Sequence, residues 1–177
     1  MKKILITGGA GFIGSHLCDF FLTKGFFVVA LDNLITGQLS NITHNSKKKN
    51  FKFFELDITH KIELDYEFDF ILNFASPASP KDFDRIPFKI IDSIAYGTKN
   101  VLDFALKHNS KVLIASTSEV YGNPIINPQS ENYNGNVSTT SPRSVYDESK
   151  RFAETLASTY AREYNLDVKI ARIFNTY

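Results

Sequence analysis

Cysteine, tryptophan and long hydrophobic runs are scarce or missing in this sequence. Its 177 residues include one cysteine and no tryptophan. A single cysteine cannot form an internal disulfide, which favours a reducing compartment. No window approaches the roughly 18 consecutive apolar residues that a membrane-spanning helix needs. The apolar run at residues 4–6 is also too short for the core of a signal peptide. We therefore expect a cytoplasmic protein that does not contact a membrane.

The charge is nearly balanced, with 20 lysine and arginine residues against 19 aspartate and glutamate residues. The net charge of +1 gives no strong field that would attract nucleic acid, so no nucleic-acid partner is expected. No repeat of the collagen or coiled-coil type is present. The hydrophobic fraction of 43% and the charged fraction of 22% are those of ordinary globular proteins. These values exclude a fibre and a disordered chain.

Short apolar runs alternate with amphipathic stretches along the chain. Such runs are typical of strands that are buried on both faces of a parallel sheet. The alternation indicates an α/β fold, a doubly wound parallel sheet of about six strands with helices on both faces and right-handed crossovers. Strands are predicted at residues 3–7, 26–31, 51–56, 68–74, 111–115 and 168–173, and the clearest helices at 98–108 and 146–164.

The first helix is predicted to follow the first strand closely. Ile13, Leu17 and Phe20 or Phe21 recur at helical spacing, so these side chains are expected to face the core. Gly25 stands where a C-terminal cap belongs.

A glycine-rich turn lies between that strand and that helix, where residues 7–14 read Thr-Gly-Gly-Ala-Gly-Phe-Ile-Gly. Glycines allow a tight turn and let a pyrophosphate approach the backbone, while the helix N-terminus offers free N–H groups. The spacing fits both G-x-G-x-x-G and G-x-x-G-x-x-G, so it does not choose a subfamily. A turn that binds no ligand is the alternative. The predicted dinucleotide site includes Gly8, Gly11, Phe12, Ile13 and Gly14.

Two acidic residues follow the second and third strands. Asp32 ends the second strand and is followed by Asn33, close to the position where an acid binds the adenosine ribose. A carboxylate there accepts hydrogen bonds from the 2′-hydroxyl and repels a 2′-phosphate. Because no lysine or arginine follows before residue 47, NAD is favoured over NADP. Asp57, which precedes Ile58, is expected either over the adenine edge or simply in a turn at the strand end.

Tyr146 and Lys150 lie four residues apart in the longest predicted helix, which places both on one helix face. The lysine cation, together with the nicotinamide charge, is expected to lower the pKa of the tyrosine from its usual value near 10. The tyrosine can then take a proton from a substrate alcohol as hydride leaves for NAD. Chance alone often produces this spacing, but its place downstream of a dinucleotide turn makes it informative.

Hydroxyl and carboxyl groups are expected just past the fifth strand, where residues 116–119 read Ser-Thr-Ser-Glu. Ligands in open α/β sheets bind beyond the carboxyl ends of the strands. A hydroxyl at this place could hydrogen-bond the reacting oxygen beside Tyr146. Glu119 is either a carboxylate of the same site or a solvated loop residue.

These motifs together resemble the extended short-chain dehydrogenase/reductases that act on nucleotide sugars, the NAD-dependent epimerase/dehydratase family. The likeness covers nearly the whole chain and is greatest for the UDP-glucuronate decarboxylase (UDP-xylose synthase) branch. The strings that carry it are Ala75-Ser-Pro-Ala-Ser-Pro80, Ala115-Ser-Thr-Ser-Glu-Val-Tyr-Gly122, Pro142-Arg-Ser-Val-Tyr-Asp-Glu148 and residues 171–177.

The resemblance implies roles for several of these residues. Thr117, Tyr146 and Lys150 match the family's oxidation triad. Ser118 with Glu119 is the decarboxylase-like combination, since related 4,6-dehydratases carry an Asp-Glu pair and simple 4-epimerases usually lack the glutamate. The resemblance also implies that Ala75 lines the cofactor site, that Asn175 contacts substrate, that NAD is the cofactor and that no metal takes part.

The implied chemistry is the conversion of UDP-glucuronate to UDP-xylose through a 4-keto intermediate. The chain departs from the family at Ile94, where an asparagine is usual. Family members also continue past the position of Tyr177 with a substrate-binding lobe. Residues 1–177 are therefore expected to form an NAD-binding Rossmann domain that lacks that lobe, and the enzyme could be inactive as this short chain.

Two further readings remain open, an NAD-binding module without turnover and a nucleotide-sugar 4-epimerase or 4,6-dehydratase. The resemblance also implies a homodimer, because the family usually pairs the helices at 91–108 and 146–164 as a four-helix bundle. The apolar residues expected at that contact are Val101, Leu102 and Ala105 on one helix and Phe152, Leu156 and Tyr160 on the other.

Overall fold

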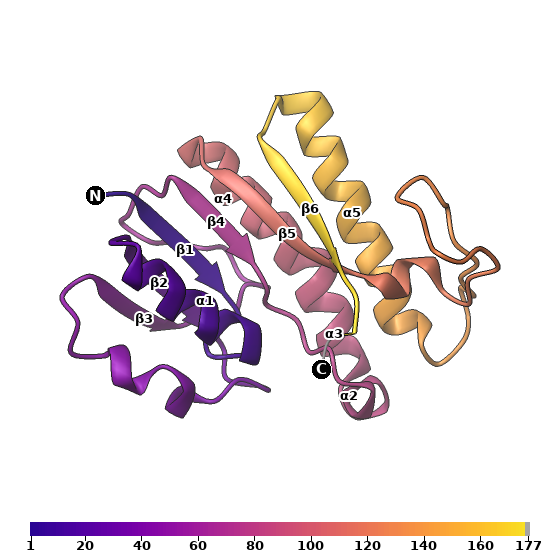
Figure 1. Ribbon diagram of the computed structural model, residues 1–177, viewed down its shortest axis with the longest axis horizontal. Coiled ribbons are helices and arrows are strands. Elements are labelled where there is room, and N and C mark those ends of the chain that lie inside the picture. Colours follow the sequence, from indigo (N-terminus) through magenta and orange to yellow (C-terminus); the bar gives the residue numbers. More distant parts are fainter. Residues whose placement is uncertain (176–177) are drawn as a thin grey trace.

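The computed structural model describes residues 1–175 and places six parallel strands in one sheet in the order β3-β2-β1-β4-β5-β6 (Figure 1). The predicted fold class is confirmed. The strands are β1 (Lys3–Thr7), β2 (Phe27–Asp32), β3 (Phe51–Glu55), β4 (Phe70–Asn73), β5 (Lys111–Thr117) and β6 (Val168–Ile173). The strand order reverses between β1 and β4, which is where open α/β sheets bind their ligands.

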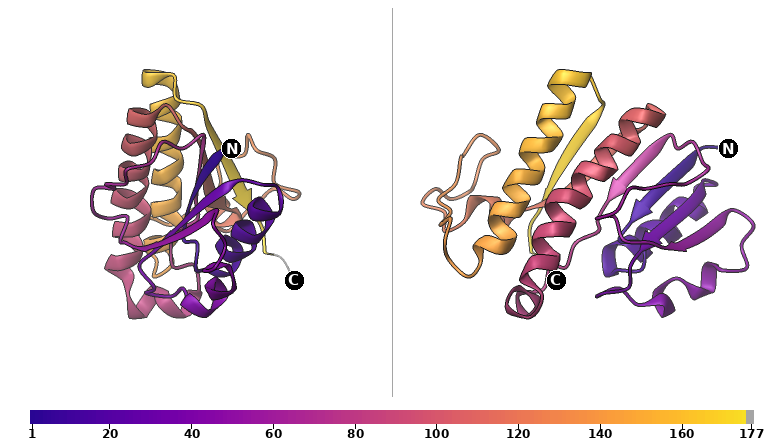
Figure 2. Two further views of the ribbon diagram at one scale, coloured as in Figure 1. Left: turned by 90° about the vertical axis from the view of Figure 1, so that its left-hand side faces the viewer. Right: turned by 180° about the vertical axis from the view of Figure 1, so that it is seen from behind.

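Alternating side chains divide the core into two layers on either side of the sheet. Leu5, Val29 and Ile71 lie side by side in register and face a cluster that includes α4 (Thr98–His108) and α5 (Ser144–Tyr164). Ile4 and Val28 point to the opposite face, against α1 (Phe12–Thr23). Figure 2 shows α4 and α5 together on one face, with α1 on the other.

The face of α1 that packs on the sheet agrees with the prediction only in part, since Leu17 and Phe21 pack against the core as expected. The buried side chains are Gly14, Ser15, Cys18 and Leu22, whereas Ile13 and Phe20 are exposed. The reason is the glycine turn, because Gly14 packs directly against the turn and small residues must therefore face inward. Gly25 has φ +77° and follows the last turn of α1, as predicted for its C-terminal cap.

A helical segment that the sequence patterns only partly indicated precedes α4. It consists of α2 (Pro80–Arg85), α3 (Pro87–Asp92) and a π-helical stretch, η3 (Ser93–Gly97), that runs directly into α4. Ile94 lies in this stretch and is 2% exposed, packed in a cluster with Phe83 and Tyr146. The residue that replaces the family's usual asparagine is thus a core residue beside the predicted catalytic tyrosine.

The remaining segments are short or irregular. The part of the chain that the structure describes holds three 3₁₀ turns, η1 (Leu39–Asn41), η2 (Thr43–Asn45) and η4 (Ser118–Tyr121). The loop between η4 and α5 holds a single isolated bridge, Gly122 to Asn136. Among residues 1–175, no helix is long and apolar enough to cross a membrane.

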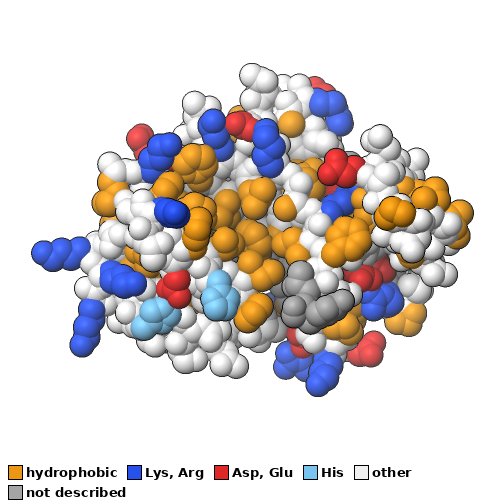
Figure 3. Space-filling view, in the orientation of Figure 1, with side chains coloured by type: hydrophobic (Ala, Val, Ile, Leu, Met, Phe, Trp, Pro, Cys, Tyr) orange, Lys and Arg blue, Asp and Glu red, His pale blue; other side chains and the backbone are white. Residues whose placement is uncertain are grey.

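One face of the sheet is covered unevenly. In Figure 1, α1 crosses this face in front of β1 and β2, and among the described residues no helix crosses it in front of β5 and β6. Figure 3, in the same orientation, shows hydrophobic side chains gathered at the centre of this face. The side chains on this side of the sheet that are only partly buried include Phe70, Leu72 and Leu113.

Candidate functional site

The turn between β1 and α1 is a tight glycine cradle. Gly8 has φ +70°, and its carbonyl accepts a hydrogen bond from the N–H of Gly11 at 3.0 Å. A Cβ atom on Gly8 would lie 2.7 Å from the backbone of Phe74, and one on Gly14 would lie 2.0 Å from the Gly8 oxygen. Real Cβ atoms do not approach backbone this closely, so both positions require glycine.

Asp32, the last residue of β2, is buried beside this turn. Its carboxylate accepts hydrogen bonds from the N–H groups of Ala10 at 3.0 Å and of Leu34 at 2.9 Å. A buried carboxylate needs such donors, because burial without partners is costly. Asp32 therefore ties the end of β2 to the glycine cradle and remains at the wall of the pocket described below.

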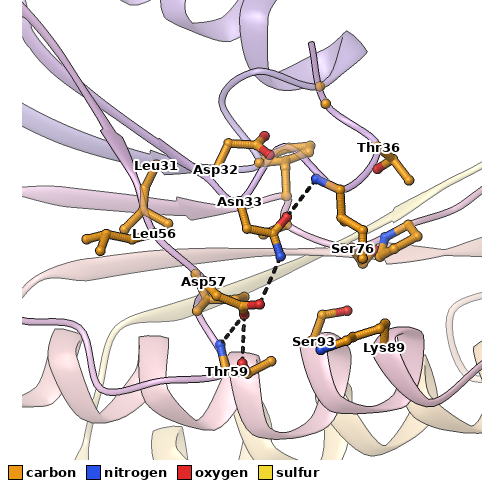
Figure 4. Close-up of a pocket in the computed structure, with 18 residues that line it drawn as sticks. Leu31, Asp32, Asn33, Thr36, Leu56, Asp57, Thr59, Ser76, Lys89 and Ser93 are labelled. Carbon is orange, nitrogen blue, oxygen red and sulfur yellow. Dashed lines mark hydrogen bonds between the residues drawn. The ribbon is translucent and has the colours of Figure 1, made fainter. Parts of the chain in front are cut away.

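Asp57 lies opposite Asp32 in the same region (Figure 4). It accepts hydrogen bonds from the Thr59 N–H at 2.9 Å, the Thr59 hydroxyl at 2.7 Å and the Asn33 amide at 3.0 Å. Partial burial raises the pKa of Asp57, but these hydrogen bonds outweigh it and hold the pKa below its ordinary value. Asp57 thus forms the strand-end turn that was one of its two expected roles, and it also lines the pocket.

A pocket opens over the glycine cradle at the carboxyl ends of β1, β2 and β4 (Figure 4). Seven of the residues predicted to bind cofactor line it: Gly8, Gly11, Asp32, Asn33, Asp57, Ile58 and Ala75. Gly14 does not line the pocket, but it packs closely against Gly8 in the turn. Phe12 and Ile13 do not line the pocket, and their side chains are 78% and 40% exposed at the start of α1.

The fold adds residues to this pocket that the sequence patterns did not mark. Lys89 and Ser93 reach it from the helical segment after β4, and Figure 4 shows both below the carboxylate of Asp57. Lys89 is the one cation among the lining residues, beside the two acids Asp32 and Asp57. No local sequence motif indicates a role for Lys89, because only the tertiary arrangement brings α3 to this edge of the sheet.

The second group of predicted residues lies at the same edge of the sheet, beyond β5. Thr117 is the last residue of β5, so the strand is longer than predicted and includes Ser116 and Thr117. Tyr146 stands in the first turn of α5, and its ring stacks on Phe83 with centroids 5.1 Å apart. Lys150 Nζ lies 5.6 Å from the centroid of the Tyr146 ring and donates to the Ala115 carbonyl at 2.9 Å.

Burial dominates the protonation equilibria of this pair. It raises the pKa of Tyr146, Glu119 and Asp147 act in the same direction, and the Thr117 hydroxyl opposes it. The downward shift was expected from Lys150 together with the nicotinamide charge, and among the protein groups alone burial and the two carboxylates outweigh the groups that lower this pKa. Burial lowers the pKa of Lys150 itself to about 8, because the low-dielectric interior disfavours the ammonium form.

Ser118 and Glu119 begin the 3₁₀ turn η4. The Glu119 N–H donates to the Thr117 hydroxyl at 3.3 Å, and the Glu119 carboxylate accepts a hydrogen bond from Arg143. Arg143 was not singled out by the sequence patterns, although it immediately precedes α5. Asn175 is exposed just past the end of β6.

The two groups of residues fit the halves of a dinucleotide site. The N–H groups of Gly9, Ala10 and Gly11 bond within the protein. The helix α1 begins at Phe12, and the N–H groups of a first helical turn have no partner inside the helix. This helix N-terminus and the positive charge of Lys89 suit a pyrophosphate. Buried carboxylates at the ends of neighbouring strands suit ribose hydroxyls. Tyr146, Thr117 and Lys150 supply a phenol, a hydroxyl and an amine at the same sheet edge. A parallel sheet in this strand order with this cradle is a Rossmann-type dinucleotide-binding fold.

Comparison with known proteins assigns the chain to a family. The family model described as GDP-mannose 4,6 dehydratase matches residues 5–177, so the chain belongs to that family of NAD-dependent epimerases and dehydratases.

Curated relatives point to one branch. The chain is 44% identical over 176 residues to UDP-glucuronic acid decarboxylase 1 of Xenopus tropicalis, covering 99% of this chain and 41% of the relative. It is 45% identical over 175 residues to UDP-glucuronic acid decarboxylase 2 of Arabidopsis thaliana, covering 99% of this chain and 39% of the relative. The chain thus spans about two fifths of the length of these relatives.

Solved structures give the same fold. The UDP-glucose 4-epimerase from Brucella ovis in complex with NAD is 28% identical and superposes with a TM-score of 0.81, covering 99% of this chain and 52% of that one. The resemblance to the decarboxylase branch, and the family's use of a nicotinamide cofactor, are confirmed by these findings.

Proposed function

We propose that residues 1–177 bind NAD and belong to an enzyme that decarboxylates UDP-glucuronate to UDP-xylose. The observation that carries this proposal is the placing of the glycine cradle with Asp32 and of the Tyr146–Lys150 pair at one edge of the sheet. The similarity to named UDP-glucuronic acid decarboxylases over 99% of this chain supports the choice of substrate.

The proposed roles follow from the chemistry of each side chain. NAD, when bound, supplies reversible hydride acceptance at C4 of the sugar. Tyr146 takes the proton from the C4 hydroxyl, Thr117 hydrogen-bonds the same oxygen, and Lys150 stabilises the phenolate that forms. A hydrogen bond to a buried oxygen is worth most when the site excludes water, and Tyr146 is 7% exposed.

Loss of carbon dioxide then follows from the C4 ketone. The product of oxidation is a β-keto acid, whose carboxylate leaves as its electron pair moves toward the C4 carbonyl. The resulting enolate is protonated at C5, and the ketone is reduced again, so the reaction has no net redox change. Glu119 is proposed to act at C5 or on the ring, and Ser118 cannot serve as the acid that a dehydratase needs.

A second candidate is an NAD-binding module without turnover, and the uneven covering of the sheet favours it. We propose that the walls around the nucleotide of the substrate come from outside residues 1–177, because the relatives are more than twice as long as the matched part. Incubation with UDP-glucuronate and NAD, followed by product analysis, separates the two candidates. Other nucleotide sugars test for a 4-epimerase or 4,6-dehydratase activity.

Calorimetry should show that NAD binds more tightly than NADP. The Asp32 carboxylate at the end of β2 would repel a 2′-phosphate, and no arginine or lysine follows it closely. Asp32→Asn should reduce the difference in affinity between NAD and NADP while keeping the side-chain shape. Asp19→Asn should leave that difference unchanged, because Asp19 bonds His44 and Asn45 and does not line the pocket. Equal affinities in the unsubstituted protein, or tighter binding of NADP, would overturn the assignment of Asp32.

The protein is also proposed to form a homodimer through α4 and α5, with Phe152 as the one exposed side chain among the contact residues first expected. Val101, Leu102 and Ala105 are fully buried against the sheet, so they cannot contact a second copy. Tyr96 and Phe152, on the same two helical segments, are 62% and 49% exposed. They are among the exposed apolar side chains of this helical face and are available for an isologous contact.

Phe152→Glu should therefore convert the protein to a monomer in sedimentation experiments, because a charge would be buried at the contact. Phe20→Glu provides the matched control, since Phe20 is 51% exposed on α1, on the opposite face of the sheet. A monomeric profile for the unsubstituted protein at high concentration contradicts the proposal.

A further inference from the structure

Arg143 is held in place at the start of α5 by its backbone. Its carbonyl accepts hydrogen bonds from the N–H of Tyr146 at 3.0 Å and of Asp147 at 3.1 Å. The guanidinium lies over the Phe83 ring, 5.6 Å from the centroid, and Phe83 stacks on Tyr146. The side chain is 47% exposed, so it remains free to move while its backbone is fixed beside the catalytic tyrosine.

The guanidinium of Arg143 faces two carboxylates from different elements. Its Nη2 donates a hydrogen bond to Oε2 of Glu119 in η4. Its Nε lies 3.7 Å from Oδ2 of Asp147 on α5, which is too far for a hydrogen bond. A guanidinium commonly pairs with one carboxylate through two parallel hydrogen bonds, and neither carboxylate receives such a pair here.

Asp147 is the carboxylate that lacks partners. Its side chain is 7% exposed, and within residues 1–175 its Oδ1 atom is buried without a hydrogen-bond donor. Burial of an unpaired carboxylate oxygen is costly. Glu119 is in the opposite situation, because its side chain is 28% exposed and water can solvate it when the guanidinium leaves. Pairing with Arg143 would supply the donor that Asp147 lacks, while water would replace the guanidinium at Glu119.

A pocket beside these groups gives the guanidinium room to move. It is lined by Glu119, Arg143 and Asp147 together with polar residues of the preceding loop, namely Asn123, Asn136, Ser138 and Ser141.

We propose that Arg143 is a positioning residue whose guanidinium exchanges between Glu119 and Asp147. Glu119 is held while Arg143 pairs with it, and Glu119 is released toward the substrate when Arg143 moves to Asp147. The role given to released Glu119 rests on the proposed function, whereas the exchange between the two carboxylates does not.

The charge on Asp147 sets the direction of this exchange. Burial raises the pKa of Asp147 to about 6, Arg143 opposes the rise, and Glu119 and Glu148 add to it. Tyr146 is the remaining titratable neighbour, and the loop residues of the pocket carry no titrating side chain. Above about pH 6 Asp147 is ionised and attracts the guanidinium of Arg143. Below about pH 6 Asp147 is neutral, and Arg143 pairs with Glu119 instead.

The ¹⁵N-edited NMR signal of the Arg143 Nε–H group tests the exchange without any need for turnover. In the unsubstituted protein the signal should shift with a midpoint near pH 6, and in Asp147→Asn this titration should be lost. Glu148→Gln is the matched control, because Glu148 pairs with Arg151, 3.4 Å away, and the titration should persist. A signal that stays constant across this range, or that titrates equally in Asp147→Asn, overturns the proposal.

A second measurement covers the case in which Asp147→Asn does not fold. The ¹³C carboxyl signal of Asp147 should titrate near pH 6 in the unsubstituted protein, and Arg143→Gln should raise the midpoint because the opposing cation is gone. An unchanged midpoint contradicts the pairing of Arg143 with Asp147. Failure of UDP-glucuronate to react would instead contradict the proposed function and leave these titrations unaffected.

Discussion

Tyr146→Phe should nearly abolish oxidation of the sugar in a chimera that joins residues 1–177 to the C-terminal part of a UDP-glucuronic acid decarboxylase. Phenylalanine keeps the ring that stacks on Phe83 and removes the hydroxyl that takes the C4 proton. General base catalysis typically contributes about 10²–10⁴-fold, so the rate should fall by at least that order. The measurement is the initial rate of UDP-xylose formation.

Tyr133→Phe is the control for that experiment. Tyr133 also carries a hydroxyl, which accepts a hydrogen bond from the Ile125 N–H at 3.2 Å in the loop before α5. Its removal should leave the rate within a small factor of the parent. If Tyr146→Phe retained the parent rate, another group would have to be the base, and the assignment of the Tyr146–Lys150 pair would be wrong.

Lys150→Met should remove a rise of the free energy of unfolding with pH that the parent protein shows. The pKa of Lys150 is about 8 in the folded protein against 10.5 for an ordinary lysine. Between these values the unfolded chain binds a proton that the folded chain does not, so the free energy of unfolding rises with pH. Below about pH 8 both states are protonated, and the folded state bears the full cost of the buried ammonium group.

The expected difference amounts to about 3 kcal/mol, from 1.36 kcal/mol per pKa unit. Urea unfolding at about pH 7 and about pH 10 should therefore show a rise in the parent that Lys150→Met lacks. Met also loses the hydrogen bond to the Ala115 carbonyl, but that loss does not depend on pH. The buried Cys18, whose pKa burial raises to about 12, lowers stability at high pH equally in both proteins.

Lys99→Met is the matched control, since Lys99 lies on the surface of α4 and is paired with Asp103. Lys99→Met should leave the rise of the free energy of unfolding with pH in place. The same increase with pH in Lys150→Met and in the parent would show that Lys150 is not the group responsible.

The sequence indicated most of the fold because its signals are local. An apolar strand, a glycine turn and an amphipathic helix are each recognisable within one short window, as in residues 3–25. The close approach of Gly14 to Gly8 explains both why the turn is glycine-rich and why α1 turns its small residues inward. The exposure of Ile13 was not predicted, because hydrophobic periodicity alone favoured Ile13 on the inner face together with Leu17, which does pack there.

The Tyr146–Lys150 pair was recognisable for a similar reason, since a spacing of four residues brings both side chains to one helix face. The protonation of this pair was not recognisable from the sequence, because the pKa of a buried group depends on all the groups packed around it. The helix predicted to hold the dimer contact illustrates the same limit. Its periodicity identified an apolar face correctly, but that face is the one buried against the sheet.

The sequence by itself determined the order of strands and helices, the glycine cradle, Asp32 and the Tyr146–Lys150 pair. These depend on backbone preference and side-chain period, which act over a few residues. Only the tertiary structure decided that Lys89 reaches the cofactor pocket and that Arg143 stands between Glu119 and Asp147. Such contacts join segments far apart in the chain, and parallel strands bring them together because all their carboxyl ends meet at one edge of the sheet.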